Sequence, residues 1–301
     1  MPCFSPLQGF RGVNGGLTFA RHLSTGLPMQ TTCGRCIGCR LERSRQWAVR
    51  CMHEASLHEE NCFITLTYSD DFLPAFGSLE KRAFQLFMKR LRRSYSRRIR
   101  FYHCGEYGEG LGRPHYHALL FGMDFADKVV WADRSGNVAW RSEYLESLWT
   151  DPESGESLGL SEIGSVTFES AAYVARYITK KITGKAAEDH YRRVDVLTGE
   201  ISQIQPEYST MSRRPGIGRG WIEKFVSDVY PSDEVISRGR PAKPPRYYDS
   251  YFGTQDPDGL LEVQKERTRR RDRSNETPER LRVREVCTTA RLNLSTRGLE
   301  C

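Results

Sequence analysis

Two histidines, His115 and His117, stand two residues apart in a run whose alternation predicts a β-strand. Residues two apart on a strand point to the same face, so both imidazoles are expected on one face of a sheet and Tyr116 on the other. Two imidazoles at this spacing can bind one divalent ion. Glu106 ends the preceding predicted strand, and a hairpin would bring its carboxylate beside both rings. Two histidines and one carboxylate leave coordination positions open, which is typical of a catalytic metal site.

A pair of tyrosines, Tyr173 and Tyr177, lies four residues apart in a predicted helix, so the two side chains share one helical face. Lys180 follows on the same side. A tyrosine hydroxyl has an ordinary pKa of about 10 and needs help to attack a phosphate. A metal ion that polarises the phosphate and a nearby lysine supply that help, and the product is a covalent phosphotyrosine. The alternative is two half-buried tyrosines that only cover a sheet.

Closely spaced cysteines indicate a second metal site. Three of them stand three residues apart: Cys33, Cys36 and Cys39. They could hold a structural Zn²⁺ with Cys3 as the fourth ligand, and Cys51 and His53 are rivals for that position. The spacing also resembles iron–sulfur runs, but Arg43 stands where the next cysteine is expected. The remaining alternative is three reduced cysteines in a loop.

The elements that position these residues follow from the pattern of apolar residues. Strands are expected at Cys62–Tyr68, Arg100–Gly105, His115–Gly122 and Ile163–Phe168, and helices at 41–57, 79–98 and Ser170–Thr183. We therefore predict an α+β fold, in which an antiparallel sheet has flanking helices. Cys62 and Cys104 fall in strands and are expected to be core residues.

Three regions are expected along the chain. Residues 1–58 form an irregular, cysteine-rich lobe and a leading helix, and residues 59–230 form the core. The core carries an insertion at about 123–162, a segment that contains nine acidic and three basic residues. Residues 231–301 form a C-terminal extension, with a charged helix at 262–285 that is interrupted near Pro278 and a tail from 286 that is partly helical or disordered.

Positive charge is concentrated in the first third of the chain. The formal net charge is +7, and residues 81–100 carry nine basic side chains and no acidic one. Such a helix can line a phosphate track, or it can be an ordinary solvated face. A basic, glycine-bearing loop at 212–218 can also approach phosphate, or it can be a simple turn. The arginines expected to bind DNA are Arg90, Arg93, Arg97, Arg213 and Arg214, and the aromatic residues considered for stacking on bases are Tyr107, Tyr116 and Trp221.

Several classes of protein are excluded. No apolar run approaches the roughly 18 residues that a membrane span needs, so no membrane association is expected. The first residues lack the apolar segment of a signal peptide. No GxxxxGK[ST] motif is present, so the chain is not expected to be an ATP-driven motor on its own.

The ordered motifs resemble those of HUH endonucleases. They are Phe63-Ile-Thr-Leu-Thr-Tyr68, then Gly105-Glu-Tyr-Gly108 with Arg113-Pro-His-Tyr-His117, then Tyr173-x3-Tyr177-x2-Lys180. The two-tyrosine form is similar to replication initiators of small single-stranded DNA phages, above all to the gokushovirus-like branch of the Microviridae. Cys33-x2-Cys36-x2-Cys39, Ser212-Arg-Arg-Pro-Gly-Ile-Gly218 and Pro245-Arg-Tyr-Tyr248 extend the resemblance to about residue 250.

This resemblance implies a rolling-circle initiator with an HUH-type antiparallel sheet. Such a protein nicks one DNA strand at the origin, stays attached to the 5′ phosphate and leaves a free 3′ hydroxyl to prime synthesis. His115, His117 and Glu106 would hold Mg²⁺ or Mn²⁺, with Tyr173 and Tyr177 as nucleophiles. The implied partners are a single-stranded or supercoiled phage DNA origin, a host helicase and the host replication machinery. The implied location is the host bacterial cytoplasm.

Two other functions remain open from the sequence. A zinc hydrolase could use the same two histidines and Glu106 with water as the nucleophile, although no HExxH motif is present. A non-catalytic DNA-binding protein could use the cysteines as a zinc module and the histidines as structural residues. Covalent capture of DNA distinguishes both from the initiator.

Overall fold

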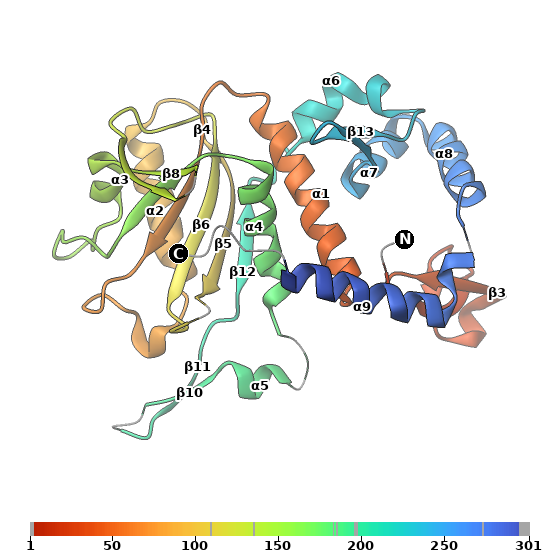
Figure 1. Cartoon of the computed structure of the whole chain (residues 1–301), viewed down its shortest axis with the longest axis horizontal. Helices are drawn as coiled ribbons and strands as arrows, with labels where there is room; N and C mark the ends of the chain where they lie inside the picture. Colours follow the sequence, from red (N-terminus) through yellow and green to blue (C-terminus); the bar gives the residue numbers. More distant parts are fainter. Residues whose placement is uncertain are drawn as a thin grey trace. The chain divides into compact units, whose positions relative to one another are not determined.

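The computed structural model describes residues 3–108, 110–134, 136–182, 184, 186–195, 198–272 and 274–294, with the backbone alone at 134 and 177–180 (Figure 1). The chain divides into two compact units. The first joins Met1–Arg45 to Gly253–Cys301, and the second is Gln46–Phe252. The expected lobe at 1–58 and the expected extension at 231–301 thus each contribute residues to both units.

An antiparallel sheet of seven strands forms the second unit, in the order β12-β5-β6-β4-β9-β8-β7. The strands are β4 (Asn61–Thr67), β5 (Arg100–Tyr107), β6 (Pro114–Phe121), β7 (Val129–Arg134), β8 (Asn137–Arg141), β9 (Ser161–Gly164) and β12 (Tyr208–Met211). The predicted α+β fold with its antiparallel sheet is confirmed, and the three strands expected to position the site lie side by side as β4, β5 and β6.

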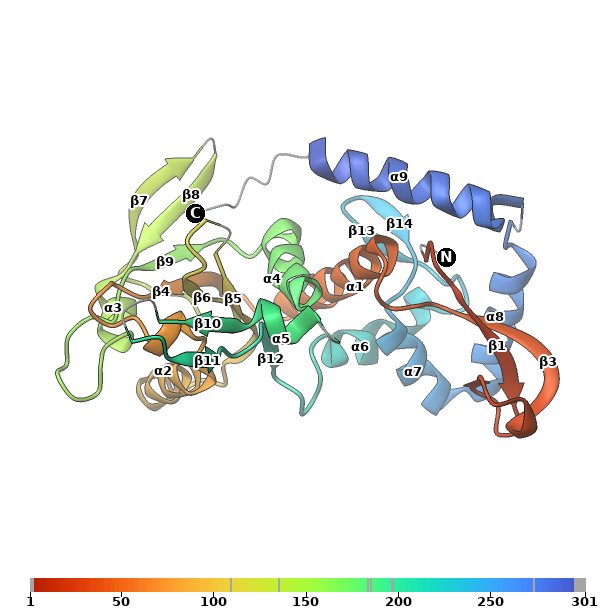
Figure 2. The same ribbon diagram turned by 90° about the horizontal axis from the view of Figure 1, so that it is seen from below.

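Helices cover both faces of this sheet (Figure 2). On one face α2 (Lys81–Ser94) and α3 (Glu143–Leu148) pack through Phe87 and Leu145 against Leu120 and Cys62 of the strands. On the other face lie α1 (Ile37–Ala55) and α4 (Phe168–Lys180), the second of which packs Val174 against the sheet. The side chains on this second face also include Cys104. Both cysteines expected in the core are therefore buried, Cys62 on the first face and Cys104 on the second. The alternation along β6 therefore turns its histidines towards α4 and Tyr116 towards α2.

The start of α4 corrects the expected fourth strand. The strand ends at Gly164, whereas the sequence predicted that it continues to Phe168. Thr167 instead caps the helix, because its hydroxyl accepts a hydrogen bond from the Ser170 backbone N–H and the Ser170 hydroxyl accepts one from the Thr167 N–H. This reciprocal pair is a capping box, which takes the apolar residue Phe168 into the first helical turn.

The acidic segment at 123–162 is an integral part of the fold. It supplies β7 and β8, which extend the sheet at its edge, and it supplies α3 and the start of β9. Trp149 of this segment is fully buried, and its indole N–H donates a 2.7 Å hydrogen bond to the Thr67 carbonyl. The segment was expected to be an insertion because its charges are conspicuous, but its few apolar residues complete the core.

The second unit also contains elements outside the seven-stranded sheet and its four covering helices. They are η2 (Ala75–Gly77), α5 (Ala186–His190), β10 (Arg192–Val194), β11 (Ile201–Gln203), α6 (Arg219–Val229), β13 (Val235–Ser237), β14 (Arg240–Ala242) and α7 (Arg246–Gln255). Strands β10 and β11 pair with each other, as do β13 and β14.

The first unit contains a small sheet that the sequence did not predict. Strands β1 (Leu7–Gly12), β2 (Leu17–Thr18) and β3 (Ser24–Thr31) pair antiparallel, with η1 (Arg21–Leu23) between the last two. Apolar side chains on or beside these strands are exposed, among them Val13, Phe19 and Leu27. Because the sheet buries neither face, the sequence has no alternation to reveal it.

Two helices of the first unit correct the expected C-terminal extension. They are α8 (Pro257–Arg269) and α9 (Pro278–Leu294), with η3 (Ser274–Glu276) between them. Pro278 begins α9 and does not interrupt a longer helix, because proline is compatible with the first turn, where no N–H partner is needed. The tail is therefore helical as far as Leu294, and 295–301 lie outside the described residues. Among the helices described here, none is long and apolar enough to cross a membrane.

Candidate active site

The register of β5 and β6 places the expected carboxylate beside the histidines. Glu106 lies directly opposite His115, and Cys104 lies opposite His117. Ligand atoms of Glu106, His115 and His117 all lie within 4.8 Å of one another. Glu106 and His117 are each only 2% exposed. The structure thus brings the three residues together on the sheet face that α4 covers.

His117 has partners on both of its ring nitrogens. Its Nε2 lies 2.8 Å from Glu106 Oε1, and its Nδ1 lies 3.0 Å from the Thr65 hydroxyl on β4. The Phe63 ring stacks on the imidazole with a centroid distance of 5.7 Å. These contacts fix the plane of the ring and, through Thr65, influence which nitrogen carries the proton.

Thr65 is a site residue that the sequence reasoning missed. It lies opposite His117 in the β4–β6 register, and it is 6% exposed. A signal was present, because the alternation that places Phe63 on one face of the strand also places Thr65 there. A buried threonine in a strand otherwise rich in apolar residues needs a hydrogen-bond partner.

The second histidine, His115, is half-buried at the end of β6. Burial is the main cause that lowers its pKa to about 4, and His117 and Arg113 lower it further. The imidazole is therefore neutral near pH 7, which is the form that binds metal ions. The end of β5 approaches this ring closely, since a Cβ atom at Gly108 would lie 2.9 Å from His115 Cε1. Glycine at 108 thus leaves room for the imidazole.

Tyr173 of α4 reaches the same group of side chains. Its hydroxyl donates a 3.4 Å hydrogen bond to Glu106 Oε1, and its ring meets His117 edge-on at a centroid distance of 5.1 Å. The helix is held in place by the capping box at Thr167 and by Val174 in the core. The side chains of Tyr177 and Lys180 lie outside what the structure describes, and only their helical backbone is placed.

Comparison with known proteins identifies the family. A sequence model of the family described as "Replication-associated protein ORF2/G2P" matches residues 61–182, which hold Glu106, both histidines and Tyr173. The replication-associated protein VP4 of Bdellovibrio phage phiMH2K is 31% identical over 274 residues, which are 87% of this chain and 80% of that protein. The chain belongs to the phage replication-associated proteins.

Two further relatives support this assignment. The replication-associated protein ORF2 of Spiroplasma virus 4 is 30% identical over 276 residues, which cover 83% of this chain and 79% of that protein. The replication-associated protein ORF4 of Chlamydia phage 1 is 28% identical over 225 residues, covering 72% and 52% respectively. No solved structure matches the chain. The expected resemblance to the gokushovirus-like branch of the Microviridae is therefore confirmed.

The arginines expected to bind DNA in this replication-associated protein lie in several separate parts of the structure. Arg90 and Arg93 lie on α2, on the opposite face of the sheet from the histidines, and Arg90 donates a 2.9 Å hydrogen bond to the Leu148 carbonyl. Arg97 is exposed and lies 4.0 Å from Glu60. Arg213 and Arg214 are exposed as well. The structure does not bring the α2 arginines to the candidate metal ligands Glu106, His115 and His117.

The glycine-bearing loop at 212–218 is held by a buried ion pair. Arg100 pairs with Glu54, and its guanidinium also donates to the carbonyls of Pro215 and Gly216 at 3.0 and 3.1 Å. Glu54 accepts a 2.7 Å hydrogen bond from the Gly218 N–H. A Cβ atom at Gly216 would lie 2.6 Å from the Tyr247 hydroxyl, and Gly218 has a φ of 74°. Packing and conformation thus account for both glycines.

The aromatic residues considered for stacking are engaged within the protein. Tyr116 is fully buried, so its side chain is not accessible for stacking on a base. The Tyr107 hydroxyl accepts from the Leu79 N–H and donates to the Gln205 carbonyl. Trp221 stacks on His53 at a centroid distance of 3.6 Å.

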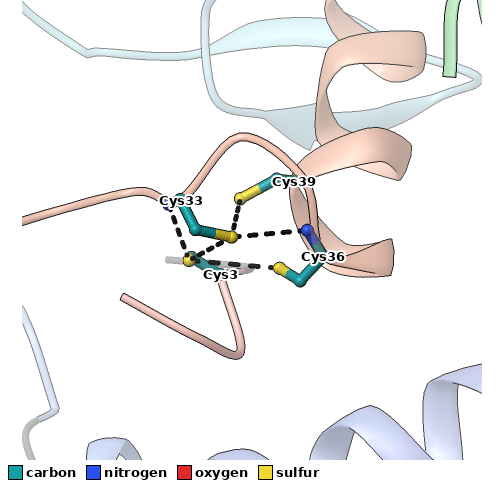
Figure 3. A group of neighbouring side chains, drawn as sticks. All are labelled: Cys3, Cys33, Cys36 and Cys39. Atoms are coloured by element: carbon teal, nitrogen blue, oxygen red, sulfur yellow. Dashed lines mark hydrogen bonds between the residues drawn. The ribbon is translucent and has the colours of Figure 1, made fainter. Parts of the chain in front are cut away.

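The four expected cysteines come together in the first unit (Figure 3). Cys3 takes the fourth position beside the triplet Cys33, Cys36 and Cys39. The two rivals lie elsewhere, because Cys51 is buried in the sheet core and His53 bonds the Tyr248 hydroxyl at 2.8 Å.

Proposed function

We propose that the protein initiates rolling-circle replication by cutting one strand of the phage DNA at its origin. The observation that carries the proposal is the meeting of Tyr173, Glu106 and His117 on one sheet face in a phage replication-associated protein. A phenol hydroxyl bonded to a carboxylate, which in turn contacts an imidazole, is suited to attack on a phosphodiester and is unusual as mere packing.

The reaction is a transfer of the phosphoryl group to tyrosine. The Tyr173 oxygen forms a bond to phosphorus, and the bond between phosphorus and the 3′ oxygen breaks. The electron pair leaves with the 3′ oxygen, which takes up a proton and becomes the free hydroxyl that primes synthesis. The Tyr173 proton has an acceptor at Glu106 Oε1, 3.4 Å away. The 5′ phosphate stays on the tyrosine until a later attack by a 3′ hydroxyl joins the strand ends.

The residues present fit a divalent cation. Two imidazoles and one carboxylate lie within 4.8 Å of one another, and Glu106 is a buried carboxylate that benefits from a positive neighbour. His115, His117 and Glu106 would hold Mg²⁺ or Mn²⁺. When bound, the ion acts as a Lewis acid that polarises the phosphate. Thr65 orients His117 for that role, because its hydroxyl engages the nitrogen away from Glu106.

The partners follow from this chemistry. The substrate is a single-stranded or supercoiled origin of the phage, because the bases beside the cut must be unpaired for the phosphodiester to reach Tyr173. The exposed arginines Arg93, Arg97, Arg213 and Arg214 contribute phosphate contacts. Because the chain lacks a P-loop motif, unwinding comes from a host helicase, and the protein works with host replication proteins in the bacterial cytoplasm.

The test is covalent capture of DNA. The full-length protein is incubated with a single-stranded origin fragment, labelled on the 3′ side of the cut, and with Mg²⁺ or Mn²⁺. A labelled adduct that survives denaturing electrophoresis is expected from the unaltered protein and not from a Tyr173→Phe, Tyr177→Phe double variant. Cleavage without an adduct would indicate a hydrolase that uses water, and salt-dependent binding without cleavage would indicate a DNA-binding protein alone. Either result would overturn the proposal.

A further inference from the structure

Four cysteine sulfurs come together in the first unit, and one of them belongs to a residue distant in sequence from the other three. Cys33 and Cys36 belong to the turn that follows β3, and Cys39 lies in the first turn of α1. Cys3 stands 30 residues before Cys33, just ahead of β1, whose Leu7 pairs with Thr31 at the end of β3. Figure 3 shows the four side chains pointing towards one another. A chance cluster of loop cysteines would not recruit a buried partner from the N-terminal segment.

The distances between the sulfurs match those around a single metal ion. They are 3.7 Å from Cys3 to Cys33, 3.9 Å from Cys33 to Cys39 and 4.0 Å from Cys36 to Cys3. Four sulfurs bound about 2.3 Å from a tetrahedral Zn²⁺ lie about 3.8 Å apart. A disulfide would need about 2.05 Å. An iron–sulfur cluster places several iron atoms between its ligands and so spreads the cysteines farther.

Backbone N–H groups are directed at these sulfurs. Cys36 and Arg35 donate to Cys33 at 3.3 and 3.5 Å, Phe4 donates to Cys36 at 3.3 Å, and Cys33 donates to Cys3 at 3.3 Å. Such donors stabilise thiolates, which are the form that binds a metal ion.

The turn between Cys33 and Cys36 is built for these bonds. Gly34 adopts a φ of +74°, a conformation that residues other than glycine rarely adopt. This conformation lets the chain fold back so that two successive N–H groups meet the Cys33 sulfur.

The first unit has little apolar core that could hold it together otherwise. Among its described residues, the buried apolar side chains are Cys3, Phe4, Val263 and Leu281. A unit with so few buried side chains cannot offset the conformational entropy of its chain by burial alone. Cys3 precedes Phe4, whose ring lies 6.0 Å from the Arg284 guanidinium of α9, so fixing Cys3 also fixes a contact to the C-terminal helix of the same unit.

We infer that Cys3, Cys33, Cys36 and Cys39 form a closed structural Zn²⁺ site that joins the N-terminal segment to the start of α1. Four protein ligands leave no open position, so the site stabilises the fold and takes no part in the DNA chemistry. On binding, the thiols release their protons to solvent and the zinc gains four sulfur ligands, with no change of oxidation state. This inference is independent of the proposed function.

The test measures metal content in the full-length protein, purified without added metal and dialysed. About one zinc per chain is expected, and Cys36→Ser is expected to lower it by about tenfold or more. Cys287→Ser is the matched control, because Cys287 is an exposed cysteine of the same unit that lies outside the cluster, and it should retain the zinc. Cys36→His supplies another zinc ligand and should retain most of it. His115→Ala must also retain it, which separates this site from the candidate active site.

A second readout keeps the inference testable if Cys36→Ser fails to fold. Co²⁺ exchanged into the unaltered protein should show the intense absorption of thiolate coordination in tetrahedral geometry. Strong chelation should expose the segment 3–31 to protease and make the thiols of Cys3, Cys33, Cys36 and Cys39 reactive. Protein without zinc whose cysteines react freely, iron in place of zinc at one per chain, or equal zinc loss in Cys36→Ser and Cys287→Ser would each overturn the inference.

Discussion

The Tyr173 hydroxyl donates a hydrogen bond to Glu106 Oε1, although 67 residues separate the two in the chain. Glu106 reaches this position from β5, and Tyr173 reaches it from α4, whose apolar side chains fix the helix on the sheet. Because the same carboxylate oxygen also lies 2.8 Å from His117, one atom links the proposed nucleophile to the expected metal ligands. A small shift of either element would therefore affect both functions of the site.

Removal of an imidazole should separate cutting from binding. His117→Ala is expected to slow adduct formation by about a thousandfold or more, because a bound metal contributes several kcal/mol to stabilising the transition state. Binding of the origin fragment should change little, since contacts to phosphate supply most of the affinity. The measurements are adduct yield over time and a salt-controlled binding titration. Rapid cutting by a His115→Ala, His117→Ala double variant without added metal would contradict the metal assignment.

Thr65 should affect the reaction through His117 alone. Thr65→Val keeps the shape of the side chain and removes the hydroxyl that contacts His117 Nδ1. We expect the concentration of Mn²⁺ for half-maximal cutting to rise by about 10- to 100-fold, as for other residues that orient a ligand. The readout is the metal dependence of adduct formation, with circular dichroism to show that the sheet is intact.

Two variants serve as controls for Thr65. Thr65→Ser restores a hydroxyl and should recover most of the metal affinity. Thr67→Val changes the same residue type two positions along β4, where the hydroxyl bonds the Leu160 carbonyl and no histidine. An equal loss in Thr65→Val and Thr67→Val would show that the strand, and not the bond to His117, is responsible.

The sequence predicted the central strands from short apolar and β-branched runs bounded by turn residues, and these strands are buried on both faces. On β6, His115 and His117 point to one face and Tyr116, between them, points to the other, so their spacing predicts the orientation of the site. The same reasoning failed for β1, β2 and β3, whose apolar side chains are exposed on both sides. The acidic charge of the segment 123–162 was also misleading as a sign of an insertion. Its apolar residues Leu145 and Trp149 are few, but they pack into the core and so make the segment part of the fold.

The sequence predicted those site residues that lie close to one another in the chain. His115, His117 and Glu106 follow from one hairpin, and the three closely spaced cysteines follow from one turn and one helical turn. Thr65 was missed because its role depends on the order of strands, which places β4 beside β6. The part played by Glu54 and Arg100 was missed for a similar reason, since their pairing joins a helix and a strand that are 46 residues apart.

Acid should destabilise the second unit before carboxylates titrate. Burial lowers the pKa of His53 to about 4, and burial together with His117 lowers the pKa of His103 well below its ordinary value. The unfolded chain, with histidine pKa values near 6.5, therefore binds more protons between pH 6.5 and 4 than the folded chain does. Stability is fully present above pH 6.5 and falls as the pH is lowered through this window.

This pH dependence can be measured by urea unfolding. All five tryptophans lie in the second unit, so their fluorescence reports its unfolding. We expect the urea midpoint to fall between pH 7 and 5, and His53→Gln to reduce that fall because glutamine does not titrate. A His53→Gln variant with the same slope as the unaltered protein would contradict the assignment to His53.

Breaking the buried ion pair should destabilise the second unit strongly. Glu54→Ala leaves the Arg100 guanidinium, 7% exposed, without its carboxylate, and we expect a loss of about 3–5 kcal/mol in the free energy of unfolding. Glu60→Ala is the control, because Glu60 pairs with Arg97 at the surface and should change stability by less than about 1 kcal/mol. Similar losses in both variants would show that burial of the pair is unimportant.

The two tyrosines should divide the cycle between them. A tyrosine that has captured DNA is blocked, whereas a round of replication ends only when the regenerated origin is cut and the old strand is joined into a circle. Tyr173 and Tyr177 are four residues apart in the sequence of α4, so a second tyrosine one helical turn along can cut while the first still holds DNA.

We therefore expect Tyr173→Phe and Tyr177→Phe each to retain part of the first adduct and to lose release of closed circles by about tenfold or more, while the double variant forms no adduct at all. Phenylalanine keeps the ring that meets His117 edge-on, so a loss in Tyr173→Phe reports the hydroxyl and not the packing of α4. The assay counts labelled circles released per adduct formed on a fragment that carries two origins. Full circle release by either single variant would mean that its missing hydroxyl is dispensable. One tyrosine would then perform both cuts, and it could make the second cut only after the first DNA strand has left it.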